Sequence, residues 1–178
     1  MYHVGNSKRS YDCANLIYEG IRQISETKSI DNITITDIQK AVGVARSSFY
    51  RSFDNINDVL DWKVNVFYQV FIEKHMNIYK PKSHSDMTIL LLQYYDQNSD
   101  LPIFLSNNKK LHILENAFDM ILKKYSTDNN VNLSPYTATL CFYLPLIMIE
   151  CKEKNKYTDS PEQIKQIIYN EMIKFFDN

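Results

Sequence analysis

Glycine and proline are scarce in this sequence, with 3 glycines and 5 prolines among 178 residues. A chain of β-strands uses both residues in its many tight turns, so the shortage disfavours an all-β fold. Hydrophobic residues make up 44% of the chain, which is enough to bury the core of one large domain or two small ones. The composition therefore favours an all-α fold.

Features of secreted and membrane proteins are also missing. The three cysteines, Cys13, Cys141 and Cys151, are far apart and form no C-x-x-C pair, which suits reduced thiols better than disulfides. The first ten residues contain no apolar segment of a signal peptide. The longest apolar run, residues 140–149, is much shorter than the roughly 20 residues that cross a membrane. We expect a cytoplasmic protein that contacts no membrane.

Motifs of catalysis and of cofactor binding are absent. The four histidines have no metal-ligand spacing, and the chain contains neither G-x-S-x-G nor a glycine-rich phosphate loop. We therefore predict that the protein is not an enzyme and that it holds no cofactor and no metal.

Positive charge is not in excess, because the formal net charge is -1. A nucleic-acid partner would therefore need a local basic patch. Residues 36–53 contain Lys40, Arg46 and Arg51 against one acid, Asp37. Residues 1–60 as a whole are balanced, with seven bases and seven acids, so any grip on DNA must come from the placement of the side chains.

The first third of the chain has the pattern of a helix-turn-helix. Apolar residues at helical spacing predict a first helix from Lys8 to about Thr27. Thr34 and Asp37 have the spacing of an N-terminal cap and predict a short helix that ends near Val42. Gly43 suits a sharp turn, and helical spacing resumes over Arg46–Phe53. Two short helices joined by a glycine turn are typical of a helix-turn-helix.

The rest of the chain predicts further helices and no strand. Asn57 is placed to cap a long helix that ends at Pro81. Five further helices are predicted over residues 85–98, 101–105, which is brief, 109–125, 134–154 and 160–176. Together with the three helices of the first third and the long helix, the prediction is about nine helices.

The last two of these helices carry apolar stripes. The stripes either close the core of one chain or meet a symmetry mate in a four-helix bundle. Their residues are Tyr136, Leu140, Tyr143, Leu144 and Ile147 in one helix, and Ile164, Ile167, Ile168, Met172, Phe175 and Phe176 in the other.

The stretch ITITDIQKAVGVARSSFYRSF resembles the N-terminal signature of the TetR family of transcriptional regulators. The resemblance covers residues 9–60 and implies an N-terminal three-helix DNA-binding domain, a long connecting helix and a helical C-terminal domain. The matching positions are Thr34, Ile38, Val42, Gly43, Val44, Phe49, Tyr50 and Phe53.

Several positions depart from the family signature. Ala45 replaces the usual serine at the start of the second short helix and removes a cap worth typically about 1 kcal/mol. Ile56 replaces a lysine that contacts phosphate in the family, which puts one DNA contact in doubt. Ser29 and Gln39 replace a glycine and an alanine.

The resemblance implies that the second short helix enters the major groove of DNA. Arg46 and Ser47, at its start, are the candidates for reading bases, and the alternative role of Arg46 is a solvated surface charge. Tyr50 is expected to contact phosphate, to pack its ring between helices, or to do both. The full set of predicted phosphate contacts is Thr36, Lys40, Ser48, Tyr50 and Arg51.

The resemblance also implies a pocket for a small hydrophobic effector beyond the first domain. Aromatic residues there are its candidate lining, and the alternative is that they form ordinary core. The candidates are Trp62, Tyr94, Tyr95, Phe104, Phe118 and Tyr143.

We therefore expect a DNA-binding domain over residues 1–56 and a helical effector-binding and dimerisation domain over 57–178. The expected function is that of a transcriptional repressor, which binds a palindromic double-stranded DNA operator as a homodimer through its last two helices. The alternatives are an activator, or a helix-turn-helix protein that binds another protein, without small-molecule induction.

Overall fold

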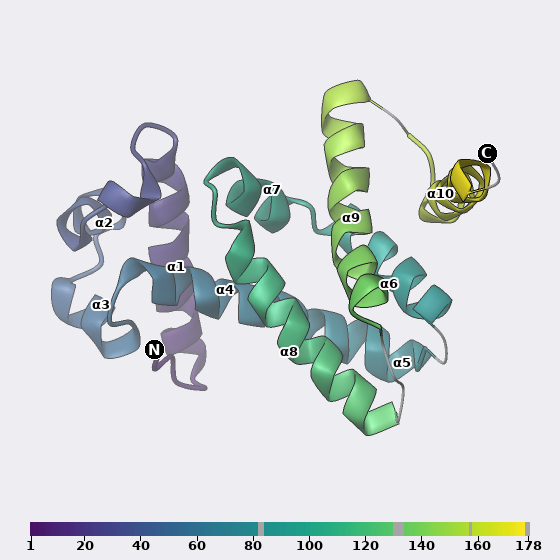
Figure 1. Ribbon diagram of the computed structural model, residues 1–178. Coiled ribbons are helices and arrows are strands. Elements are labelled where there is room, and N and C mark those ends of the chain that lie inside the picture. Colours follow the sequence, from purple (N-terminus) through teal and green to yellow (C-terminus); the bar gives the residue numbers. More distant parts are fainter. Residues whose placement is uncertain (82–83, 130–133, 157, 177–178) are drawn as a thin grey trace. The chain divides into compact units, whose positions relative to one another are not determined.

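The structure is a computed structural model. It describes residues 1–81, 84–129, 134–156 and 158–176, without the side chains of residues 84, 85, 129, 137, 155 and 171–176. The described chain is helical and divides into two compact units, Figure 1. Unit 1 consists of Met1–Gln69 and Phe104–Ala117, and unit 2 of Val70–Ile103 and Phe118–Asn178.

Unit 1 begins with three helices that pack on one another. They are α1 (Lys8–Ser25), α2 (Ile35–Val42) and α3 (Arg46–Ser52), with a 3-10 turn, η1 (Ile30–Asn32), between α1 and α2. The first part of α4 (Ile56–Phe71) follows α3 in the same unit. The short loop from α2 to α3 and the longer one from α1 to α2 are visible in Figure 1.

The core of unit 1 forms where these helices turn their apolar sides inward. Ile17 and Ile21 of α1 are fully buried, as their spacing predicts. Ile38 of α2 and Phe49 of α3 are buried with them. Burying each such side chain contributes about 1.5–3 kcal/mol, so this core holds α2 and α3 in place.

Gly20 allows α1 and α2 to approach closely. A Cβ atom at this position would lie 3.1 Å from both γ-carbons of Val42. That distance is tighter than an ordinary van der Waals contact, and a larger side chain would push the helices apart.

Trp62 of α4 also belongs to unit 1. Its side chain is only 4% exposed and its ring makes edge contacts with Tyr11 and Phe53, at centroid distances of 5.5 and 6.0 Å. The Lys63 ammonium lies 4.7 Å from the ring centre of Tyr18 and donates a hydrogen bond to Asn15 Oδ1 at 2.8 Å. Burial lowers the pKa of Lys63.

The long helix predicted to be capped by Asn57 already begins at Ile56, so the predicted cap is wrong. Asn55 Oδ1 accepts the Asp58 backbone N–H at 3.1 Å, and Asp58 Oδ2 accepts the N–H of Asn55 in return. Asn57 lies inside the first turn of α4 and is exposed. The buried carboxylate of Asp58 accepts the N–H of Asp54 at 3.0 Å as well as that of Asn55. These two hydrogen bonds place Asn55, and not Asn57, at the cap of the helix.

The helix that starts at Ile56 continues through a π-helical segment, η2 (Ile72–Met76), to α5 (Asn77–Tyr79). Lys80 ends it with φ of 46°, next to Pro81, where the sequence predicts the end.

Unit 2 contains the remaining helices or parts of them. They are α6 (His84–Gln97), α7 (Asp100–Asn107), α8 (Leu111–Asn129), α9 (Pro135–Asn155) and α10 (Pro161–Phe176), and α7 and α8 each begin in one unit and end in the other.

Within unit 2, α6 packs against α9 and also contacts α10. Thr88 of α6 shares a hydrogen bond with Cys141 of α9 at 3.4 Å, and an ion pair joins Lys152 to Asp96. Gln93 donates to Glu162 of α10 at 2.8 Å. Polar side chains thus join three helices around an apolar interior.

The all-α fold is confirmed for the described part of the chain. Nine helices result when α4, η2 and α5 are counted as one continuous helix, in agreement with the predicted number. The segment 101–105, predicted to be brief, is part of the two-turn helix α7. Within the residues described, no helix is both long and apolar enough to span a membrane.

Candidate nucleic-acid interface

The start of α2 has the predicted cap. Thr34 Oγ1 accepts the Asp37 N–H at 3.2 Å, and Asp37 Oδ2 accepts the Thr34 N–H at 2.8 Å, which completes a capping box. Lys28 donates to the same carboxylate oxygen at 2.6 Å. The Lys28 ammonium and the Thr34 donors hold the pKa of Asp37 far below its usual value.

The turn between α2 and α3 depends on Gly43. Its φ of 70° is in the left-handed region, and its N–H donates to the carbonyl of Gln39 at 2.9 Å. A residue with a Cβ would be strained there, so glycine fixes the direction in which α3 leaves the turn. The predicted helix, turn and helix are confirmed.

Two aromatic side chains hold α3 against the core. Phe49 and Phe53 follow at a spacing of four, are almost fully buried and lie with ring centroids 5.9 Å apart. Ala45 occupies the N-cap position without a side-chain hydrogen bond, as the sequence predicts. Packing rather than capping therefore positions α3, and the side of the helix opposite Phe49 is left to solvent.

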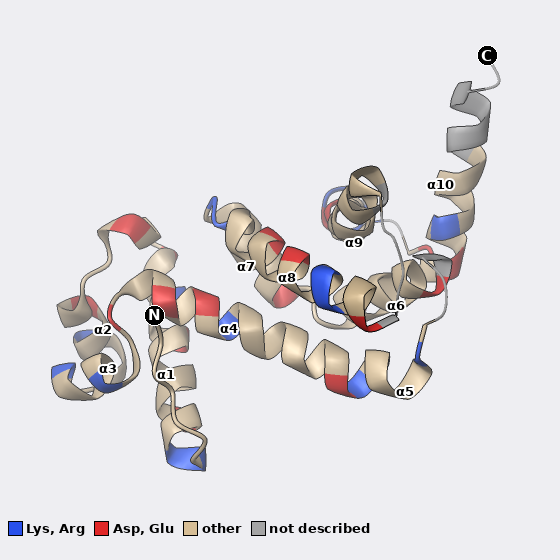
Figure 2. Ribbon diagram, turned by 60° about the horizontal axis from the view of Figure 1, so that its bottom comes forward, with Lys and Arg blue, Asp and Glu red and all other residues tan. Residues whose placement is uncertain are grey.

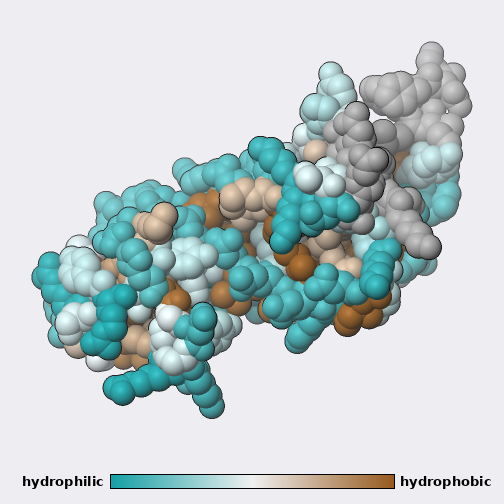
Figure 3. Space-filling view, turned by 90° about the horizontal axis from the view of Figure 1, so that it is seen from below, coloured by the Kyte–Doolittle hydropathy of each residue, from teal (hydrophilic) through white to brown (hydrophobic). Residues whose placement is uncertain are grey.

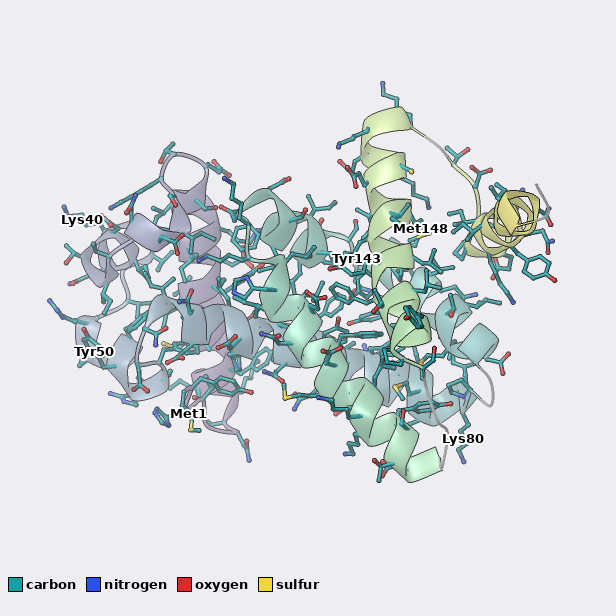
Figure 4. The ribbon with its side chains drawn as sticks, in the orientation of Figure 1. Met1, Lys40, Tyr50, Lys80, Tyr143 and Met148 are labelled. Atoms are coloured by element: carbon teal, nitrogen blue, oxygen red, sulfur yellow. The ribbon has the colours of Figure 1, made fainter. Side chains whose placement is uncertain are left out.

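The predicted DNA-binding residues lie on the solvent side of α2 and α3. All are exposed except Ser48, which is half-buried at the edge of α3. Lys40 and Tyr50 extend outward from their helices, as Figure 4 shows. On the face that Figure 3 shows, the surface of unit 1 is mostly hydrophilic. The residues so placed are Thr36, Lys40, Arg46, Ser47, Ser48, Tyr50 and Arg51.

The cations of this surface are available to an anionic partner. Among the described residues, Lys40, Arg46 and Arg51 form no ion pair. Asp37, the one acid within residues 36–53, is paired with Lys28. Figure 2 shows the basic residues of α2, α3 and the first turn of α1 on the ribbon. Local charge is therefore positive although the chain as a whole is not.

Tyr50 is 47% exposed, and its ring contacts its own helix. The ring meets Phe49 edge-on at 5.7 Å, and the Arg46 guanidinium lies 5.7 Å from the Tyr50 ring centre. Arg46 and Tyr50 remain exposed despite these contacts. Contact with phosphate stays a prediction for Tyr50, as base reading does for Arg46.

A second polar feature borders α3 and was not predicted. His3 donates its backbone N–H to the Ser52 carbonyl at 2.7 Å, and Tyr2 pairs with Phe53 in an isolated β-bridge. The segment before α1 is thereby held beside the end of α3. A cavity of about 420 Å³ between them is lined by His3, Gly5, Ser7, Arg9, Ser10, Cys13, Ser48, Arg51 and Ser52.

The aromatic residues predicted to line an effector pocket are divided between the units. Trp62 and Phe104 lie in unit 1, where Phe104 contacts Tyr18 at 5.8 Å. In unit 2, burial raises the pKa of Tyr94. The remaining candidates in unit 2 are Tyr95 and Phe118, which are buried, and Tyr143, which is partly exposed.

A cavity of about 350 Å³ between α9 and α10 has an apolar lining made of other side chains. They are Ile147, Met148, Cys151, Ile164, Ile167 and Ile168, with Lys152 and Asp159 as the charged members. An effector site for the predicted aromatic residues stays a prediction.

Four of the five residues in the apolar stripe of α9, Tyr136, Leu140, Tyr143 and Ile147, are exposed within a single chain, and Leu144 is half-buried. Ile147 also lines the cavity between α9 and α10, so the dimer role of the stripe stays a prediction. Met148, by contrast, is buried and leaves α9 on another side, Figure 4. In α10, Ile167 is exposed, whereas the side chains of Met172, Phe175 and Phe176 lie outside those described.

In the described part of the chain, no three His, Cys, Asp or Glu side chains are grouped closely enough to hold a metal ion.

Comparison with known proteins gives one informative similarity. Over 114 residues the chain is 23% identical to the HTH-type dhaKLM operon transcriptional activator DhaS of Lactococcus lactis subsp. lactis (strain IL1403). The match covers 64% of this chain and 56% of that protein, so the chain spans about half the length of the relative. No protein-family model matches the sequence, and no solved structure does.

Proposed function

We propose that the protein is a DNA-binding transcription regulator whose α3 enters the major groove. The observation that carries the proposal is the exposed polar face of α3. Phe49 and Phe53 anchor the helix-turn-helix in the core of unit 1 and leave this opposite face in solvent. The similarity to a named transcriptional activator supports the same class of function.

In this proposal the residues of α3 contact bases and phosphates, and those of α2 contact phosphates. Arg46 and Ser47, at the start of the helix, reach base edges, and the arginine fork suits the O6 and N7 atoms of guanine. Thr36, Lys40, Ser48, Tyr50 and Arg51 contact the phosphates on either side of the groove and fix the register.

The protein binds as a homodimer in this proposal. The exposed stripe of α9 supports it, since Leu140, Tyr143 and Ile147 would leave water when two copies meet. A two-fold dimer presents two recognition helices and therefore requires a palindromic operator with half-sites about one helical turn apart.

We further propose that residues 57–178 bind a small hydrophobic effector and that the protein works in the cytoplasm. Differential binding of the effector to two conformations would change the affinity for the operator. Repression is the proposed sign of regulation, and a reporter gene behind the operator, with and without the protein, measures it. Higher reporter output with the protein present would replace repression by activation, the role named for the relative.

Selection of bound duplexes from a random pool tests the proposal. We expect enrichment of a palindrome by the wild-type protein. Arg46→Ala should lose discrimination at one position of each half-site by about 1–3 kcal/mol. Lys124→Ala, which removes an exposed charge from α8, is the matched control and should keep the wild-type preference.

A different result would favour a protein-interaction module. If no duplex is enriched and no DNA is retained even at low salt, the basic surface does not serve DNA. Retention without enrichment would instead place Arg46 among the phosphate contacts and remove its role in reading bases.

A further inference from the structure

A cavity lies between the first residues of the chain, α1 and α3, and only two of its lining residues, Ser48 and Arg51, are among the DNA contacts proposed above. Its volume of about 420 Å³ exceeds that of several water molecules, about 30 Å³ each in the liquid. Its polar lining comes from segments that are far apart in sequence, with Arg9 and Ser10 from α1 and Ser48 and Arg51 from α3. Tertiary packing therefore assembles it.

The chemistry of the lining is that of an anion site. The residues that line the cavity include two arginines, four serines and one histidine, and none is Asp or Glu, although the His3 imidazole lies 3.5 Å from Asp54 Oδ1. Neither Arg9 nor Arg51 forms an ion pair among the described residues. Arginine forks and hydroxyl donors together match the oxygens of a phosphate group.

The position of the cavity on α3 relates it to DNA. At about 100° per residue, Arg46 and Tyr50 lie along one edge of the exposed face of α3, while Arg51 and the half-buried Ser48 lie along the other, next to the buried Ser52. The part of α3 that lines the cavity is Ser48, Arg51 and Ser52, and not Arg46 or Ser47, which are proposed to read bases. A helix in the major groove has a phosphate backbone on each flank.

We propose that this cavity holds one phosphate of the operator backbone, with Arg9 as a DNA contact in addition to those on α2 and α3. The proposal rests on the proposed DNA-binding function. The segment around His3 closes the cavity, because its backbone hydrogen bond to Ser52 at 2.7 Å holds it beside α3. Arg9 and Arg51 then bind the same phosphate from two helices.

The first test uses the salt dependence of binding to a duplex of mixed sequence. Each neutralised phosphate contributes about 0.9 to the slope of log affinity against log salt concentration. Arg9→Gln should therefore reduce the slope by about 0.9, so that its deficit against wild type is about 3.5-fold larger at 50 mM than at 200 mM salt.

Lys8→Gln is the matched control. It removes one positive charge from the residue next to Arg9, and Lys8 does not line the cavity. It should change the slope by less than half as much as Arg9→Gln. The losses of binding free energy caused by substituting Arg9 and Arg51 should also be non-additive, since loss of either side chain releases the shared phosphate.

The second test neutralises the phosphates of the selected operator one at a time with methylphosphonate. At one position per half-site, the change should weaken the wild-type protein and have no further effect on Arg9→Gln. If wild type binds DNA but Arg9→Gln keeps the wild-type slope and the full methylphosphonate pattern, the cavity is no phosphate site and the proposed function stands. If wild type binds no DNA at low salt, both proposals fail.

Discussion

At the residue scale, the Asp37 carboxylate belongs both to a local helix cap and to an ion pair with a residue outside the helix. The spacing of Thr34 and Asp37 predicts the cap from sequence alone, and the structure confirms it. The partner Lys28 could not be predicted in this way, because it reaches Asp37 only after the chain has turned through η1. Capping depends on neighbours in sequence, whereas ion pairs depend on the fold.

The Asp37 contact predicts a specific loss of stability in acid. Its pKa is lowered in the folded state from an ordinary value of 3.8, so the stabilisation is complete above about pH 5 and is lost as the pH falls below 4 through the folded-state pKa. Asp37→Asn should be less stable than wild type at pH 7, and the difference should shrink at pH 3. Urea unfolding followed by circular dichroism at both pH values measures it.

Asp12→Asn serves as the control for this prediction. It removes an exposed carboxylate from α1 without touching the capping box. An equal stability difference between wild type and Asp37→Asn at pH 7 and pH 3 would contradict the role assigned to the carboxylate.

The cap of α4 marks a limit at the same scale. Asn55 and Asn57 are both good capping residues, and composition does not choose between them. The reach of the Asp58 carboxylate back to the N–H groups of Asp54 and Asn55 makes the choice. Asn55 and Asp58 are three residues apart, as Thr34 and Asp37 are. This spacing was the feature of the sequence that could have identified Asn55 as the cap of α4.

At the element scale, the turn between α2 and α3 is determined by one glycine. A Cβ at Gly43 would find open space, with no atom within 4 Å, so a substitution there costs only backbone strain. Gly43→Val should destabilise the protein by about 1–2 kcal/mol, because a β-branched residue is poorly tolerated at positive φ. Gly43→Asn should cost less, since asparagine adopts this conformation more readily.

Chemical unfolding of both variants checks this prediction, and operator affinity should fall in the same order. Equal stability of the valine and asparagine variants would show that the turn relaxes to another conformation and does not fix α3.

The elements of the candidate interface were largely predictable, but its full extent was not. Helical periodicity and a glycine at the turn identify α2 and α3 from local sequence, and the buried Phe49 and Phe53 define the face that remains exposed. The segment before α1 joins the interface through the backbone contact of His3 with Ser52. A backbone pairing across about fifty residues leaves no pattern in side-chain type.

At the scale of the whole molecule, the proposed dimer makes the clearest prediction. Leu140 of α9 is 44% exposed and lies in the apolar stripe but not in the lining of the α9–α10 cavity, whereas Met120 of α8 is 59% exposed and lies outside the stripe. Leu140→Glu should shift the protein to monomer, because two carboxylates would face each other in an apolar interface. Met120→Glu should leave the dimer intact.

Sedimentation velocity at matched concentrations measures the shift, and affinity for a duplex with two half-sites should fall with it. A wild-type monomer, or a Leu140→Glu variant that sediments as wild type does, would exclude α9 as the dimer contact.

The packing of Trp62 has a practical consequence. It is the sequence's single tryptophan, and its ring lies buried among aromatic side chains of unit 1. Its fluorescence emission should therefore be blue-shifted in the native protein and move to the red when unit 1 opens. Tryptophan emission thus reports on unit 1 alone, while helix content reports on both units, so comparing the two signals during unfolding shows whether the units melt together or one at a time.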